Sequence, residues 1–278
     1  MNNGKLYHLA AFAEGDTGGN PAGVWIGDEL PDSATMQQIA ADVGASETAF
    51  MAPSTGARRT IRYFSPEMEV SFCGHATIAS GVTLGRSDGE GVYTLDTPVG
   101  EVEVTAAISG GAMEASLRSV ATRQEPIPDS SLADALDCLG WSCDVLDSSL
   151  PPIKAWAGAW HYVIAVANKA VLEALNYDFE ALKALMLREG LTTLQLVWRE
   201  RDDRFHSRNP FPVGGIFEDP ATGAAAAALG GYLRDAGFVE TPFEFEILQG
   251  DAMGMPSRIF VNVPDEGGII VRGGARSI

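Results

Sequence analysis

Two segments of the chain repeat each other at a fixed distance, and this repeat limits the fold more than any other feature. Ala76-Thr77 aligns with Ala221-Thr222 at an offset of 145 residues, from position 76 to position 221. The same offset brings Leu84-Gly85 onto Leu229-Gly230. Both segments are rich in Ala and Gly, which suits a helix packed closely inside a curved sheet. Chance agreement between common small residues is the alternative, and the similar surroundings of the two segments argue against it.

Strand and helix signals recur on both sides of residues 121–130, a polar stretch with two prolines that is the best linker candidate. Before it, alternating and apolar segments predict strands at 5–13, 24–26, 47–52, 59–64, 92–95, 101–107 and 112–117. A helix is expected after Asp32, ending at Gly44, and another from residue 74 or 75. After the linker, we expect helices at 132–139 and 179–188, a helix after 219, and strands at 162–166, 193–199, 243–248, 258–263 and 269–272.

These elements predict an α+β chain with two domains. One half covers residues 1–120 and the other covers residues 121–265. The last strand, about residues 266–278, is expected to join the first half.

Charge and hydropathy exclude two classes of partner. The net charge is −18, from 37 acidic and 19 basic side chains. A surface this negative disfavours nucleic acid and anionic membranes, both of which are bound through Lys and Arg. No stretch approaches the roughly 20 apolar residues of a membrane span, and no secretory signal is readable. We therefore expect a cytoplasmic protein.

Most familiar site motifs are missing. The chain has no GxxxxGK, HExxH or GxSxG segment. Its three cysteines, Cys73, Cys138 and Cys143, form no CxxC pair, and its four histidines show no metal-ligand spacing. Neither a disulfide framework nor a metal site is expected. Chemistry must then come from carboxylates, a histidine, or backbone amides at helix starts.

Two helix starts are candidate anion sites. Asp219 followed by Pro220 is typical of a helix N-cap with proline in the first turn, and capping alone would explain the aspartate. A helix N-terminus also offers free N–H groups to a carboxylate or an enolate, and Gly223 would let a ligand approach the backbone. Gly74 and His75 form the equivalent start in the first half. His75 there either caps the helix or passes a proton to a ligand.

Glu47 lies in the segment GASETAF, among small and apolar residues. A capping or surface role is the plain interpretation, since composition does not single it out among the acidic residues. A glutamate partly buried in such surroundings is, however, a suitable base for a C–H proton.

Five motifs in this order resemble the phenazine-biosynthesis PhzF-like family, and together they cover almost the whole chain. They are GNPAGV at 19–24, MQQIAADVGASETAF at 36–50, RYFSPEMEVSFCGHAT at 62–77, GGIFEDPATGAAA at 214–226 and LQGDAMGMPSRI at 248–259. The resemblance implies the diaminopimelate epimerase-like fold, in which two similar domains each wrap a curved sheet around a central helix. It also implies an active site in the cleft between the domains, and a homodimer.

The family's functional residues carry over to this sequence. The resemblance implies that Glu47 is the general acid/base and that His75 and Asp219 contact the substrate and assist. It extends substrate binding to a set of small and polar residues, which are Asn20, Gly74, Ala76, Gly223 and Ala224. Epimerases and racemases of the superfamily have two facing cysteines at the helix starts. This chain has Gly74 and Asp219 there, and Cys73 stands one residue early.

The family's known reaction isomerises trans-2,3-dihydro-3-hydroxyanthranilate by removing a proton from carbon and returning it elsewhere, without a metal or an organic cofactor. The family commonly has Ser where this chain has Ala224, so one hydrogen bond to that substrate is expected to be missing. Two alternatives remain open at this point. One is a racemase or epimerase of the same superfamily, and the other is a homologue that binds a small ligand without catalysis.

Overall fold

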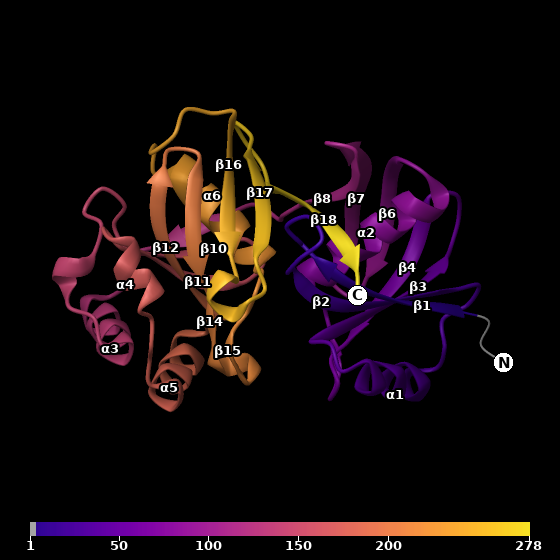
Figure 1. Ribbon diagram of the computed structural model, residues 1–278, viewed down its shortest axis with the longest axis horizontal. Coiled ribbons are helices and arrows are strands. Elements are labelled where there is room, and N and C mark those ends of the chain that lie inside the picture. Colours follow the sequence, from indigo (N-terminus) through magenta and orange to yellow (C-terminus); the bar gives the residue numbers. More distant parts are fainter. Residues whose placement is uncertain (1–3) are drawn as a thin grey trace. The chain divides into compact units, whose positions relative to one another are not determined.

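The computed structural model describes residues 4–278 and divides into two compact units. The first unit comprises the chain up to Arg118 together with Arg272–Ile278, and the second comprises Ser119–Val271. The sequence places these boundaries at residue 120 and about residue 266. Each unit combines strands with a helix that the strands surround (Figure 1).

The strands of the first unit pair in the order β1-β2-β3-β4-β6-β7-β8-β18, and β18 also pairs with β1, which closes a barrel. The short strand β5 pairs with β4, and helix α1 covers the outside of the barrel against β3 and β4. The bounds are β1 (Gly4–Ala11), β2 (Asn20–Gly27), α1 (Ser33–Val43), β3 (Glu47–Pro53), β4 (Arg58–Phe64), β5 (Glu69–Val70), α2 (Gly74–Asp88), β6 (Gly91–Thr97), β7 (Gly100–Ser109), β8 (Ala112–Arg118) and β18 (Ile270–Ser277).

Helix α2 lies inside this barrel, and every residue from His75 to Gly85 is buried. Its small residues are required by the packing. A Cβ atom at Gly81 would lie 2.4 Å from a Val104 methyl group, and one at Gly85 would lie 2.5 Å from the sulfur of Met113. The Ala/Gly composition therefore reflects the close approach of the strands to the helix.

The second unit repeats the strand pairing of the first. In the first unit, β1/β2 is antiparallel, β2/β3 parallel, β3/β4 antiparallel, β4/β6 parallel and β6/β7 antiparallel. The strands of the second unit that correspond are β10 (Ile153–Trp156), β11 (Trp160–Ala165), β12 (Thr193–Arg201), β13 (Arg204–Arg208), β16 (Phe243–Gln249) and β17 (Ser257–Val263). Their pairs, taken in this order, show the same alternation. Along the chain, the buried helix α2 lies between β4 and β6 in the first unit, and the buried helix α6 (Gly223–Asp235) lies between β13 and β16 in the second. This correspondence is the structural basis of the 145-residue repeat.

The remaining helices of the second unit pack on the strands away from α6. Helices α3 and α5 contact each other and bury an apolar core that includes Leu139, Leu182 and Leu196. The bounds are β9 (Arg123–Glu125), α3 (Asp129–Leu139), β10 (Ile153–Trp156), β11 (Trp160–Ala165), α4 (Lys169–Glu173), α5 (Phe179–Glu189), β12 (Thr193–Arg201), β13 (Arg204–Arg208), β14 (Pro210–Phe211), β15 (Ile216–Glu218), α6 (Gly223–Asp235), β16 (Phe243–Gln249) and β17 (Ser257–Val263). None of the helices in the described part of the chain has the length and hydropathy of a membrane span.

The linker prediction for residues 121–130 is wrong. Strand β9 occupies its centre and pairs with β10, and helix α3 begins at Asp129. Strand β9 lies at the end of the strand order, where a neighbouring proline is tolerated because one edge needs no donor. Pro126 directly follows β9 and Pro128 is the N-cap residue of α3. The two prolines therefore mark the end of a strand and the start of a helix, and they do not mark a linker.

The start of α6 also differs from the prediction. The helix begins at Gly223 with Thr222 as its N-cap residue, so Asp219 does not cap it and Pro220 is not its first residue. The cause is the side chain of Gln249, whose amide donates to the Asp219 carbonyl at 2.7 Å and accepts from the Thr222 N–H at 3.3 Å. These bonds hold the segment as a turn, and the helix starts after it.

One buried histidine makes stability depend on pH. His161 on β11 is fully buried, with Nδ1 2.8 Å from the Thr193 hydroxyl, and burial lowers its pKa to about 4. In the unfolded chain a histidine binds a proton near pH 6.5. The unfolded state therefore binds more protons between about pH 6.5 and about pH 4, so this group destabilises the fold as the pH falls through that window. The full effect is about 3 kcal/mol.

Urea unfolding at several pH values tests this effect. Between pH 7 and pH 5, the unfolding free energy of His161→Gln should fall less than that of wild type. This holds whatever the stability of the variant at pH 7. His8→Gln removes an exposed histidine and should leave the wild-type pH dependence in place. Equal pH dependence in wild type and His161→Gln would show that His161 is not the responsible group.

Candidate active site

Glu47 begins strand β3, where it lies opposite Ala22 of the parallel strand β2. Helix α1 ends at Gly44, whose φ of 67° is in the left-handed region that glycine adopts easily. The chain then turns into β3. The Glu47 side chain is 22% exposed, whereas the next residues, Thr48 and Ala49, are buried. The fold thus places a carboxylate that is largely shielded from water but still accessible.

The first turn of α2 holds two further groups. Cys73 is the N-cap residue, and its carbonyl accepts from the Thr77 N–H at 3.0 Å and from the Thr77 hydroxyl at 2.7 Å. The Tyr63 hydroxyl lies 2.7 Å from the Thr77 hydroxyl, and since Thr77 donates to the carbonyl, Tyr63 donates to Thr77. Burial raises the pKa of Tyr63 well above its ordinary value, so this donor keeps its proton. The chain of bonds fixes the turn that carries Cys73 and His75.

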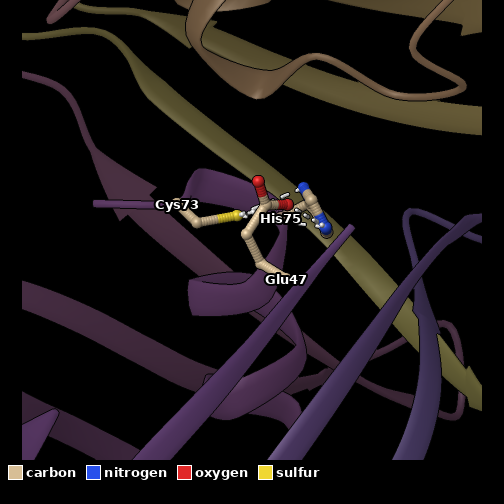
Figure 2. A group of neighbouring side chains, drawn as sticks. All are labelled: Glu47, Cys73 and His75. Atoms are coloured by element: carbon tan, nitrogen blue, oxygen red, sulfur yellow. Dashed lines mark hydrogen bonds and ion pairs between the residues drawn. The ribbon is translucent and has the colours of Figure 1, made fainter. Parts of the chain in front are cut away.

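The side chains of Glu47, Cys73 and His75 converge, as Figure 2 shows. The Cys73 thiol donates to Glu47 Oε2 at 3.5 Å, and His75 Nε2 lies 3.5 Å from the same oxygen. The Cys73 sulfur is 3.4 Å from His75 Nδ1. The hydroxyl of Ser46 lies 3.2 Å from His75 Nε2.

This arrangement suits proton transfer. A carboxylate is a general base, and an imidazole at 3.5 Å is within reach of proton exchange after a small movement. His75 is only 8% exposed, so it reaches solvent chiefly through its neighbours. The structure therefore brings together two of the three predicted catalytic residues, Glu47 and His75, and adds Cys73.

The predicted binding residues of the first unit lie on α2 and on β2, the strand that pairs with β3. Asn20 is the buried first residue of β2, two residues before the one opposite Glu47. Gly74 and Ala76 flank His75 in the first turn of α2. Gly74 and Ala76 are well placed to present backbone N–H groups to a ligand, because the first turn of a helix leaves its N–H groups without helical partners.

The other predicted residues belong to the second unit. Asp219 is half-buried, and its carboxylate accepts from the Thr222 hydroxyl at 2.6 Å. Gly223 and Ala224 form the first turn of α6 and are also half-buried. Gln249 joins both ends of this segment, because its amide also donates to the Thr222 hydroxyl at 3.0 Å.

Sequence reasoning missed three contributors. It treated Cys73 only as a cysteine out of register with the epimerase pattern, although its place directly before the Gly74-His75 helix start was the available signal. It gave Ser46 no role, although Ser46 directly precedes Glu47. It also quoted Gln249 within a motif without a function, and no local pattern shows that this side chain ties the Asp219 turn.

Comparison with known proteins decides the family. A family model described as phenazine biosynthesis-like protein (PhzC-PhzF) matches residues 9–275. The chain belongs to this family. A relative from Pseudomonas fluorescens named trans-2,3-dihydro-3-hydroxyanthranilate isomerase is 32% identical over 261 residues, which cover 91% of this chain and 87% of the relative. Other relatives are also named isomerases, and the chain is an isomerase of this family.

Solved structures share the fold. A PhzF-family phenazine biosynthesis protein from Bacillus anthracis superposes with a TM-score of 0.88 at 24% identity, covering 100% of this chain and 97% of that one. A hydroxyproline epimerase from Agrobacterium vitis gives a TM-score of 0.66 at 14% identity, covering 98% and 90% of the two chains. The predicted α+β, epimerase-like fold with two similar halves is confirmed.

Proposed function

We propose that this PhzF-family isomerase moves a proton on a small amino- or hydroxy-carboxylate, with Glu47 as the general acid/base. The observation that carries the proposal is the carboxylate of Glu47, largely shielded from water and in contact with the thiol of Cys73 and the imidazole of His75. Groups of this kind are positioned for proton transfer at the start of a buried helix. No step needs a group from outside the chain.

In the proposed reaction, Glu47 removes a proton from a carbon next to a carboxylate or a conjugated amine. The electron pair of the broken C–H bond spreads into the conjugated system, and the protonated Glu47 then delivers a proton to another carbon. Backbone N–H groups at Gly74 to Ala76 would stabilise the anion formed on the way, as donors at a helix start do for developing charge. His75 would exchange the proton with Glu47 or hold a polar group of the substrate.

The family resemblance assigns Asp219, Gly223 and Ala224 to substrate binding, and we keep this assignment as part of the proposal. Asp219 is held in place by Thr222 and Gln249, so its carboxylate is suited to orient an amino or hydroxyl group. Ala224 stands where the family commonly has serine. The phenazine precursor would thus lose a hydrogen bond here, and we expect a related carboxylate to be the better substrate.

Turnover of a substrate panel tests the proposal. Proton NMR would follow trans-2,3-dihydro-3-hydroxyanthranilate and a set of small amino- and hydroxy-acids with the enzyme alone. We expect conversion of at least one compound to a positional isomer. We also expect Ala224→Ser to raise kcat/KM on the phenazine precursor by up to about tenfold, the worth of one net hydrogen bond. Inversion at a Cα centre without positional isomerisation would overturn the proposal in favour of a racemase.

A further inference from the structure

The contact among Glu47, Cys73 and His75 has a second chemical meaning. The three side chains offer a carboxylate oxygen, a sulfur and an imidazole nitrogen, all within 4.8 Å of one another. These are the donor types that zinc prefers in proteins. Spacing along the chain did not reveal the set, because Glu47 comes from β3 and the other two from the start of α2.

The distances match one face of a zinc tetrahedron. Zinc bonds of about 2.0–2.3 Å at tetrahedral angles set neighbouring ligand atoms about 3.4–3.6 Å apart. Here the Cys73 sulfur and Glu47 Oε2 are 3.5 Å apart, and Glu47 Oε2 and His75 Nε2 are also 3.5 Å apart. The sulfur and His75 Nε2 are 3.9 Å apart, so closing the face needs a shift of a few tenths of an ångström.

The surroundings favour a cation at this point. A ligating Cys73 thiolate would lie at the N-terminus of α2, where the helix dipole favours negative charge. With the Glu47 carboxylate it would balance the two charges of the ion. The Glu47 side chain is 22% exposed, which leaves the ion a route from solvent to the carboxylate. The net charge of −18 raises the local concentration of cations.

We propose that Glu47, Cys73 and His75 bind one zinc ion, and that zinc reversibly inhibits the isomerase. Binding releases the thiol proton of Cys73 to solvent, so that sulfur, nitrogen and oxygen each donate an electron pair to the metal. Glu47 Oε2 then no longer accepts a proton from substrate. The binding stands by itself, whereas the inhibition rests on the proposed role of Glu47 as the base.

Calorimetry with zinc chloride and the full chain tests the binding. We expect one zinc site in wild type. In Cys73→Ser the zinc affinity should fall by at least about 100-fold, because even the loss of a group that only supports a ligand costs about 10–100-fold in metal affinity. Cys143→Ser removes an exposed cysteine remote in sequence and should bind zinc as wild type does. Cobalt in place of zinc should give a thiolate charge-transfer band in wild type and Cys143→Ser, and none in Cys73→Ser.

Wild-type zinc affinity in a folded Cys73→Ser variant, or a cobalt spectrum without the thiolate band, would overturn the proposal. Circular dichroism melting of both variants shows whether they are folded, and Cys73→Ala provides a second variant without the sulfur. Zinc at one equivalent should stop turnover, and a chelator should restore it. Zinc that binds the three side chains yet raises turnover contradicts inhibition. A chain that binds zinc but turns over no substrate would refute the proposed function and leave the zinc site standing.

Discussion

Glu47→Gln should lower kcat by about 10²–10⁴-fold, the usual contribution of a positioned acid/base. Glutamine keeps the shape and the hydrogen-bonding reach of the side chain but neither takes up nor releases a proton at neutral pH. The loss should fall on kcat rather than KM, because the proton transfer belongs to the transition state. Steady-state rates on any substrate identified in the panel provide the measurement.

The matched control for this prediction is Glu67→Gln, which makes the same chemical change at an exposed glutamate of the same unit. It should retain wild-type kcat. Thermal melting of both variants separates loss of chemistry from loss of fold. A folded Glu47→Gln enzyme with near wild-type turnover would remove Glu47 from the role of base.

Glu218→Ala should cost about 3–5 kcal/mol of unfolding free energy, the usual penalty for breaking a buried ion pair. The Glu218 side chain is 5% exposed and that of Arg208 is 12% exposed. Arg208 Nε donates to Glu218 Oε2 at 2.9 Å, and a second guanidinium nitrogen pairs with the other oxygen. Without the carboxylate, a buried guanidinium would keep only neutral partners such as the carbonyl of Glu173 at 3.1 Å.

Asp134→Ala gives the comparison for Glu218→Ala. Asp134 pairs with Arg188, and both side chains are more than half exposed. Exposed pairs contribute about 0–1 kcal/mol, so this variant should unfold at nearly the wild-type urea midpoint. Equal urea midpoints for the two variants would contradict the prediction that the buried Arg208–Glu218 pair contributes more to the free energy of unfolding than the exposed pair does. Because Glu218 directly precedes Asp219, its loss should also weaken the substrate binding that we propose for Asp219.

Much of the fold could be predicted because the signals were local. Asp32 caps α1 through its bond to the Thr35 N–H at 2.9 Å, and Gly44 ends that helix, as the sequence indicates. The Ala- and Gly-rich segments are buried helices because the strands leave no room for larger side chains. The strands β10 and β13, in contrast, were not anticipated. These strands have only four and five residues, so their alternation of apolar and polar side chains is too short to be distinguished from the surrounding sequence.

The rest depended on contacts between distant residues. Asp219-Pro220 has the local pattern of a helix start, but the side chain of Gln249, 30 residues away from Asp219, holds it as a turn. By sequence, Cys73 is only a cysteine one residue before the Gly74 helix start, and the packing of α2 against β3 brings it to Glu47. Family resemblance therefore pointed to Glu47 and His75, whereas the contacts of Cys73 and Gln249 required the three-dimensional structure.

The most direct test of the central claim is the incorporation of deuterium from D₂O into substrate carbon, followed by NMR, with wild type and Glu47→Gln side by side. The abstracted proton can exchange with solvent while Glu47 holds it, before the proton is returned, so wild type should place deuterium on product carbon and Glu47→Gln should place almost none. Equal incorporation by the two enzymes would contradict the account, because another group would then be moving the proton.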